Sequence, residues 1–145
     1  MARRSERHLL GLAALHERVA RAIYEERGPK VLQPGQWSAL RFFERAGGEA
    51  RTVTALSKYL GVTLGPASRA AAALERRGLI SPSPNPKDRR GLIFELTEQG
   101  RAQLAKDPLK RFASALGAAD DTDREAFSRV LFHLFDELDT TKGRV

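Results

Sequence analysis

The stretch from Thr52 to Thr97 constrains the fold of this chain more than any other segment. Its first part contains two short helical patterns, one over residues 53–60 and one that starts after Thr63, separated by Gly61. Thr63 is a suitable N-cap residue, and Pro66 is tolerated because it falls in the first helical turn, where backbone donors lack helical partners. Two helices joined by so short a turn form a helix-turn-helix, and in DNA-binding proteins the second helix enters the major groove.

A basic hairpin is predicted directly after the second helix. Residues 79–80 and 91–96 are expected to form two paired strands, whereas residues 81–86 contain three prolines, which lack the N–H that a strand ladder requires. The tip at residues 87–90 places three cations around one carboxylate. A helix-turn-helix followed by such a hairpin predicts a winged helix. The alternative is a solvated surface hairpin that follows an unrelated helix pair.

The sequence resembles the MarR family of winged helix-turn-helix transcription regulators in four segments that follow the order and spacing of that family. These segments are Leu32–Leu40, Ala55–Ile80, Asn85–Gly91 and Leu96–Gly100. A chain of 145 residues has the length of one domain. The resemblance implies a mainly α fold with a small β-wing. Within residues 1–145, it places a winged helix-turn-helix lobe at 30–100 and dimerisation helices at 1–28 and 101–145.

The last of the helices outside this lobe carries more apolar surface than one face can bury in a small monomer, because Phe132 and Phe135 lie outside its apolar stripe. A first helix is expected over residues 5–27. A helix capped by Thr97 continues through Leu104, and Asp107-Pro108 then interrupts or restarts it. A last helix is expected to start near a capping box at Thr122 and Glu125. Together with the resemblance, the excess predicts a homodimer; the alternative is that the extra aromatic side chains pack within one subunit. The predicted dimerisation residues are Leu12, Leu15, Val19, Phe112, Phe127, Leu131, Leu134 and Phe135.

The resemblance also implies roles in DNA binding for individual residues. Arg69 has the forked donors that pair with guanine or with a phosphate, and its alternative role is an ion pair with Asp88 or Glu75. Arg90 matches the arginine of the family that enters the minor groove, and Asp88 matches the carboxylate that orients its guanidinium. The predicted DNA-binding residues are Lys58, Thr63, Gly65, Pro66, Ser68, Arg69, Lys87, Asp88, Arg89 and Arg90.

A small-molecule site is expected only from the resemblance, because members of this family often release DNA when they bind small aromatic acids or phenols. By residue type and by the resemblance, the predicted ligand-binding residues are His16, Trp37 and Arg41. Trp37 belongs to an aromatic cluster in a helix expected over residues 34–45, where core packing is the alternative role. No third ligand lies near His8 and His16 in the sequence, so no metal site is predicted.

Charge and composition argue against several other functions. The formal net charge is +7, and the basic surplus lies in the first 100 residues, which favours a polyanionic partner. The absence of cysteine excludes disulfides and thiol oxidation as a sensing chemistry. No signal peptide and no apolar run of membrane-spanning length are present, so a cytoplasmic location without a membrane partner is expected. Neither a nucleophile elbow nor a phosphate-binding glycine loop occurs, and we expect no enzyme activity and no cofactor.

These features together predict a sequence-specific transcription regulator, expected to be a repressor. We expect it to bind double-stranded DNA as a homodimer at a near-palindromic site and to be released by a small aromatic effector. Two alternatives are a sequence-independent architectural DNA-binding protein, which the basic surplus also favours, and a winged helix that binds other proteins.

Overall fold

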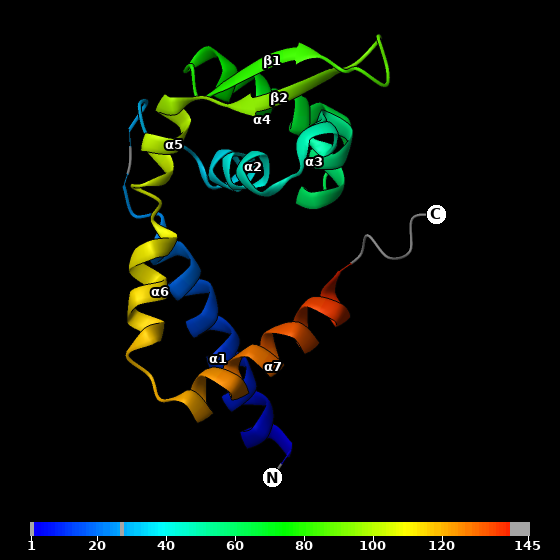
Figure 1. The fold of residues 1–145 in the computed structure, drawn as a ribbon. Helices are drawn as coiled ribbons and strands as arrows, with labels where there is room; N and C mark the ends of the chain where they lie inside the picture. The colour runs from blue at the N-terminus through cyan, green and yellow to red at the C-terminus, as the bar shows by residue number, and fades with distance from the viewer. Residues whose placement is uncertain (1, 27, 140–145) are drawn as a thin grey trace.

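The computed structural model describes residues 2–26 and 28–139, which form two lobes joined at one side (Figure 1). In chain order, the elements are α1 (Ala2–Ile23), α2 (Pro34–Arg45), a 3-10 turn (Gly48–Ala50), α3 (Val53–Leu60), α4 (Leu64–Arg76), β1 (Ile80–Pro84), β2 (Leu92–Leu96), α5 (Glu98–Leu104), α6 (Leu109–Gly117) and α7 (Asp121–Leu138). Helices α2 to α5 and the β1–β2 hairpin make the upper lobe, and α1, α6 and α7 make the lower lobe. The predicted fold class, mainly α with a small β-wing, is confirmed.

Local sequence chemistry sets the helix boundaries in the upper lobe. Thr52 caps α3, since its hydroxyl oxygen accepts a hydrogen bond from the N–H of Ala55 at 3.1 Å. Gly61 ends this helix with φ 66° and ψ 31°, a left-handed conformation that favours glycine. Thr97 caps α5 in the same way through the N–H of Gly100, at 3.0 Å. Because these signals are local, the observed bounds of α2, α3 and α5 follow the predicted ones closely.

The hydrophobic core lies entirely within the upper lobe. Its largest fully buried side chains are Phe43, Leu40, Leu56, Leu74 and Ile80. They come from α2, α3, α4 and β1, so α2 is packed between the helix-turn-helix and the hairpin. The ring of Phe43 also lies 5.5 Å from that of Phe94 in β2, centroid to centroid. This core fixes α4 and the hairpin relative to one another.

Strand β1 includes residues that we expected outside the ladder. Residues Ile80–Pro84 pair in antiparallel register with Leu92–Leu96, so that Pro82 lies opposite Phe94. Phe94 donates its N–H to the carbonyl oxygen of Arg51, 2.9 Å away and outside the hairpin. The N–H of Phe94 therefore points away from β1, and the Pro82–Phe94 pair requires no donor from proline. The predicted end of this strand at Ile80 was wrong, because residues 81–84 also pair with β2. The prolines do not make this segment a central strand, since both strands of a two-stranded sheet are edges.

The bounds of two helices in the lower lobe, α1 and α7, differ from the prediction. Helix α1 ends at Ile23, earlier than its predicted end at Arg27, which lies outside the described residues. Helix α7 is capped by Asp120, whose Oδ1 accepts the N–H of Asp123 at 2.9 Å, and not by the predicted box at Thr122. Residues 140–145 of the predicted C-terminal dimerisation segment also lie outside the described residues.

The lower lobe leaves its apolar side chains exposed. Among the described residues, α6 and α7 contain no buried side chain. Phe132 is 70% exposed and Leu138 is 73% exposed on α7, and Leu9 of α1 is also exposed. No helix in the described ranges combines the length and the apolarity that a membrane crossing requires. The described residues therefore leave much of the apolar surface of these helices uncovered.

Replacing Gly100 with alanine is expected to destabilise the upper lobe by about 1–3 kcal/mol through overpacking. A Cβ at this position would lie 2.2 Å from the carbonyl oxygen of Leu79 and 2.9 Å from Cδ1 of Leu96. Urea unfolding followed by circular dichroism measures the change. Gly35→Ala is the matched control, because a Cβ there meets nothing within 4 Å. Equal stability of Gly100→Ala and wild type would show that α5 is not packed against β2 as described.

Candidate nucleic-acid interface

The exposed side of α4 presents most of the predicted base-reading residues. Ala67, Ala71 and Leu74 are buried against the core, and Ser68 and Arg69 are exposed. Also exposed are Lys58 of α3 and, at the start of α4, Thr63, Gly65 and Pro66. The helix-turn-helix thus gathers the predicted residues of its two helices on one accessible surface.

The side chains of Arg69 and Thr63 are both available at this surface. The guanidinium of Arg69 folds back along α4, because a Cβ placed at Gly65 would lie 3.4 Å from its Nη1. Within the part of the chain that is described, Arg69 forms no ion pair with Asp88 or Glu75, the alternative role considered for it. Thr63 occupies the N-cap position of α4, but its side chain makes no capping hydrogen bond. Its hydroxyl group can therefore bond to an outside partner.

Leu64 is an exposed apolar residue at this surface that the sequence analysis missed. It is the first residue of α4 and is 55% exposed, and Val62 just before it is 40% exposed. At the start of a helix that enters the major groove, an apolar side chain can contact the methyl group of thymine. The only sequence signal for Leu64 is its position outside the buried stripe of α4.

The tip of the wing is shaped by side chains that bond to its own backbone. We use "wing" for β1, β2 and the connecting residues 85–91. The Oδ1 atom of Asp88 accepts the backbone N–H of Arg90 at 3.0 Å, and Oδ1 of Asn85 accepts the backbone N–H of Lys87 at 3.0 Å. In this structure Asp88 therefore acts on the backbone of Arg90 and not, as predicted, on its guanidinium.

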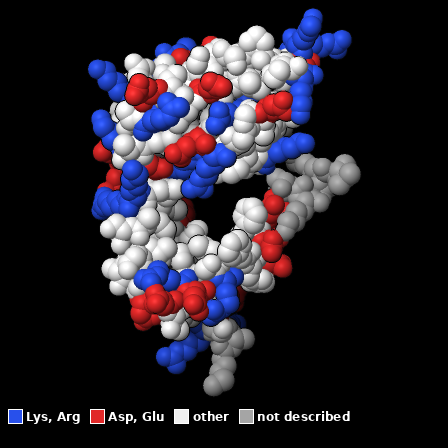
Figure 2. All heavy atoms as spheres, in the orientation of Figure 1, with Lys and Arg blue, Asp and Glu red and all other residues white. Residues whose placement is uncertain are grey.

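The wing tip concentrates positive charge at one corner of the molecule. Figure 2 shows Lys and Arg side chains gathered at this corner, whereas the surface over α6 and α7 has large uncharged areas. Arg89 and Arg90 are exposed. Lys87 instead pairs with Glu49 of the 3-10 turn, and the hydrogen bond to Glu49 raises the pKa of Lys87 above its ordinary value. The predicted cations are thus brought together, but Lys87 already has an acidic partner.

A cavity of about 720 Å³ lies where the end of α1 meets the start of α2 and the α5–α6 turn. Its lining includes the apolar and aromatic residues Tyr24, Leu32 and Trp37 and the cations Lys30, Lys106 and Arg111. Of the predicted ligand-binding residues, Trp37 lines this cavity, whereas His16 and Arg41 are not among its lining residues. No group of three His, Asp or Glu side chains that could hold a metal ion occurs in the described ranges.

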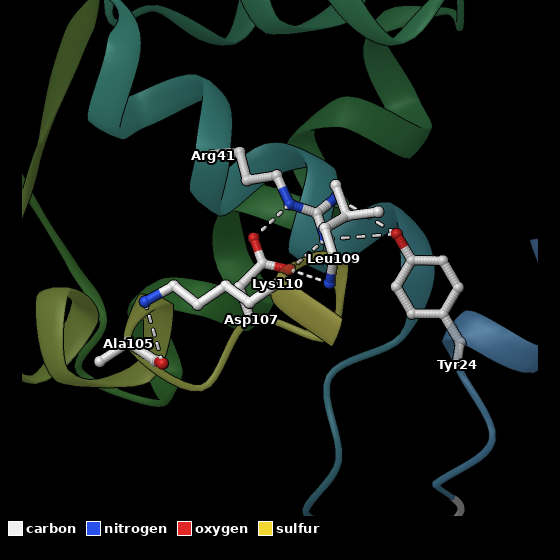
Figure 3. Close-up of polar contacts among 6 residues, drawn as sticks. All are labelled: Tyr24, Arg41, Ala105, Asp107, Leu109 and Lys110. Atoms are coloured by element: carbon white, nitrogen blue, oxygen red, sulfur yellow. Dashed lines mark hydrogen bonds and ion pairs between the residues drawn. The ribbon is translucent and has the colours of Figure 1, made fainter. Parts of the chain in front are cut away.

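Arg41 joins the two lobes through a buried ion pair with Asp107 in the turn between α5 and α6 (Figure 3). Its Nε and Nη2 donate to Oδ2 and Oδ1 of Asp107 at 2.6 and 2.7 Å. The hydroxyl oxygen of Tyr24 accepts from Nη1 and Nη2 at 3.2 and 3.3 Å. Oδ1 of Asp107 also accepts the N–H of Leu109 in α6, at 2.8 Å. We call these four residues the interlobe junction.

The interlobe junction keeps both charged groups ionised. Burial alone raises the pKa of Asp107, but hydrogen bonds from Arg41 and from the N–H of Leu109 hold this pKa below its ordinary value. Burial lowers the pKa of Arg41, while hydrogen bonds to Asp107 and Tyr24 raise it above the ordinary value. Ionised Asp107 therefore stabilises the folded state above the ordinary carboxyl pKa, and this contribution is lost as the pH falls through and below that range.

Comparisons with known proteins agree with this geometry. A MarR family model matches residues 32–91, which extend from just before α2 to the wing tip. A MarR family transcription regulator, SP03579, has the same fold, with a TM-score of 0.74 and 20% identity over 99% of each chain. The transcriptional repressor CouR, solved on a 23-mer DNA duplex, is 28% identical over 85% of this chain and 91% of that chain, with a TM-score of 0.64.

A probable transcriptional regulator from Pseudomonas aeruginosa is 25% identical over 86% of this chain and 94% of that chain, with a TM-score of 0.68. No curated protein sequence matches this chain. The family model and the solved structures thus agree on the segment that carries the helix-turn-helix and the wing. Residues 32–91 therefore match the model of the MarR family, and the chain shares its fold with solved MarR family transcription regulators.

Proposed function

We propose that this chain is a sequence-specific repressor that binds a near-palindromic DNA site as a homodimer. The observation that carries the proposal is the exposed polar and basic side of α4, which shares one lobe with the exposed cations of the wing. A face of this kind fits the major groove while a wing reaches the neighbouring minor groove. The likeness to CouR, a repressor solved on a DNA duplex, supports double-stranded DNA as the partner and repression as the effect on transcription.

In the proposed complex, the first two turns of α4 read the bases. Arg69 donates to guanine or to a phosphate, and the hydroxyl groups of Ser68 and Thr63 bond to base edges or to the backbone. Gly65 and Pro66 carry no long side chain, so the helix can approach the groove closely at this turn. The half-buried Ala72 and Ala73 of the next turn can discriminate bases only through apolar contacts.

The wing and α3 supply most of the electrostatic attraction. Arg90 enters the minor groove, Arg89 contacts a phosphate, and Lys58 contacts a phosphate from α3. Lys87 must separate from Glu49 before it can contact DNA, so its net contribution is smaller than that of the two arginines. Because these contacts displace counterions, the affinity is expected to fall as the salt concentration rises.

Arg90→Ala is expected to weaken binding to the operator by roughly 1–3 kcal/mol, because one specific groove contact is lost. Fluorescence anisotropy titration with a labelled operator at fixed salt measures the change. Arg101→Ala removes the same charge from α5, at the other end of the lobe (Figure 1), and is expected to bind nearly as wild type. Superimposable titrations of Arg90→Ala and wild type would remove the wing from the proposed interface.

The proposed dimer interface consists of the apolar sides of α1, α6 and α7. Its exposed members are Leu12, Leu15, Val19, Leu131, Leu134 and Phe135, and its half-buried members are Phe112 and Phe127. Leu131, Leu134 and Phe135 are spaced three and four residues apart and form a continuous apolar stripe on α7. Exposed stripes of this extent are rare on monomers, and a two-fold partner would cover them with the same surface.

Leu134→Asp is expected to convert the dimer to a monomer, because it places a charge in the centre of the apolar stripe of α7. Sedimentation velocity reports the mass, which should fall toward the 16.0 kDa of one chain. The control His133→Asp introduces the same charge on another side of α7 and should remain dimeric. A dimeric Leu134→Asp protein, or a monomeric wild type, would refute the proposed interface.

We also propose that a small aromatic acid binds the cavity and releases DNA. Trp37 and Tyr24 offer aromatic surface, and Lys30, Lys106 and Arg111 offer positive charge for a carboxylate. The cavity lies where the two lobes meet, so a ligand there can favour one arrangement of the lobes over another. Arg41 contributes through the interlobe junction beside the cavity, whereas His16 of α1 is not among the residues that line it.

Titration with a hydroxybenzoate is expected to change the fluorescence of Trp37, the only tryptophan, in a saturable way and to weaken DNA binding in parallel. The matched hydroxybenzamide, which lacks the negative charge, should bind more weakly. Fluorescence and operator affinity are measured on the same samples. An unchanged Trp37 signal, or binding that leaves the operator affinity as it was, would contradict the effector proposal.

A further inference from the structure

The interlobe junction is unusual for a contact between two packed units because its central members are charged and buried. The side chains of Arg41 and Asp107 are only 9% and 12% exposed. They come from α2, which lies in the core of the DNA-binding lobe, and from the turn that leads into α6 of the lower lobe. By contrast, the ion pair Arg111–Glu25, which joins α6 to the chain after α1, is exposed and spans 3.8 Å.

We propose that Arg41 and Asp107 are positioning residues for DNA recognition, which set the spacing between the half-sites that the dimer accepts. The pair fixes the direction in which the DNA-binding lobe leaves the lower lobe. In a two-fold dimer this direction determines the separation of the two α4 helices. The inference rests on the proposed homodimer and goes beyond it, because it assigns operator spacing to two residues that do not touch DNA.

The geometry of the pair suits control of orientation as well as distance. Two parallel N–H···O bonds of 2.6 and 2.7 Å form a fork between the guanidinium and the carboxylate, and such a fork resists rotation, which an apolar contact does not. The carboxylate is in turn fixed to the first residue of α6 through the N–H of Leu109. One carboxylate therefore connects the orientation of α2 to that of α6 (Figure 3).

The bonds of Arg41 favour this role over direct contact with an effector. Each of its three guanidinium nitrogen atoms already donates to Asp107 or to the hydroxyl oxygen of Tyr24. The guanidinium also lies 5.9 and 6.0 Å from the ring centroids of Trp37 and Tyr24, respectively, both of which line the cavity. Arg41 thus packs against two residues that line the cavity without lining it itself, and it connects them to α2 of the DNA-binding lobe.

The position of the junction amplifies any change in its geometry. The junction lies at one side of the upper lobe, whereas the wing tip lies at the opposite side (Figure 1). A small rotation at the junction therefore displaces the DNA-reading surface by a larger amount. DNA places successive major grooves on one side of the duplex at fixed intervals, so such a displacement changes which spacing fits.

The test measures affinity for operators in which one base pair is inserted between the half-sites or removed. Wild type should bind the selected spacing best. In Asp107→Asn and Arg41→Lys, the ratio of affinities between the selected and the altered spacings should fall roughly 2- to 30-fold, the range expected when coupling residues are changed. Arg41→Lys keeps the positive charge but loses the fork, so it should lose spacing discrimination even where it stays as stable as wild type.

Two controls separate positioning from a merely structural role. A duplex with a single half-site should bind each variant as it binds wild type, because α4 and the wing are unchanged. Glu25→Gln breaks the exposed ion pair with Arg111 from its other side and should keep the spacing profile of wild type. If both junction variants lose affinity by the same factor at every spacing, the positioning role is overturned. A flat profile for wild type would instead overturn the two-fold arrangement itself, and the positioning role with it.

Discussion

The ion pair between Arg41 and Asp107 is the interaction on which the arrangement of the whole chain depends. The upper lobe has a complete apolar core of its own, and the described helices α6 and α7 bury no side chain. The contact between α2 and the turn before α6 includes a charged pair taken out of water, which stabilises only if its geometry is good and its remaining hydrogen bonds are satisfied. Tyr24 and the N–H of Leu109 supply those bonds. The structure therefore forms the upper lobe by apolar packing and links it to α6 through a directional polar contact.

Much of the upper lobe could be predicted from sequence because its signals are local. Thr52, Gly61 and Thr97 mark helix ends through bonds and backbone conformations that span only a few residues. The apolar spacing of α4 places Ala67, Ala71 and Leu74 toward the core, and this leaves Ser68 and Arg69 exposed. The proposed DNA-reading surface follows from the same periodicity. The exposure of Ser68 and Arg69 could therefore be predicted before any tertiary contact was known.

Some features could not be predicted because they join residues that are distant in sequence. Another depends on the direction in which the backbone N–H groups of a strand point. Arg41 and Asp107 are 66 residues apart, and nothing in either local segment signals the other. Pro82 is compatible with β1 only because Phe94 directs its N–H to Arg51. The ion pair between Lys87 and Glu49 likewise joins the wing tip to the 3-10 turn, and no sequence motif links these two segments. Sequence periodicity shows which side of an element is buried, but it does not show which polar group on another element that side will meet.

Selection of genomic DNA fragments by the purified chain, followed by sequencing of what binds, tests the central claim most directly. If two copies of α4 are held at a fixed separation, the bound fragments should share an inverted repeat whose half-sites lie about 10 base pairs apart, centre to centre. Each such site should bind two copies of the chain. Bound fragments without a common motif would instead indicate sequence-independent binding through the basic surface, and a single half-site occupied by one copy would contradict the two-fold arrangement.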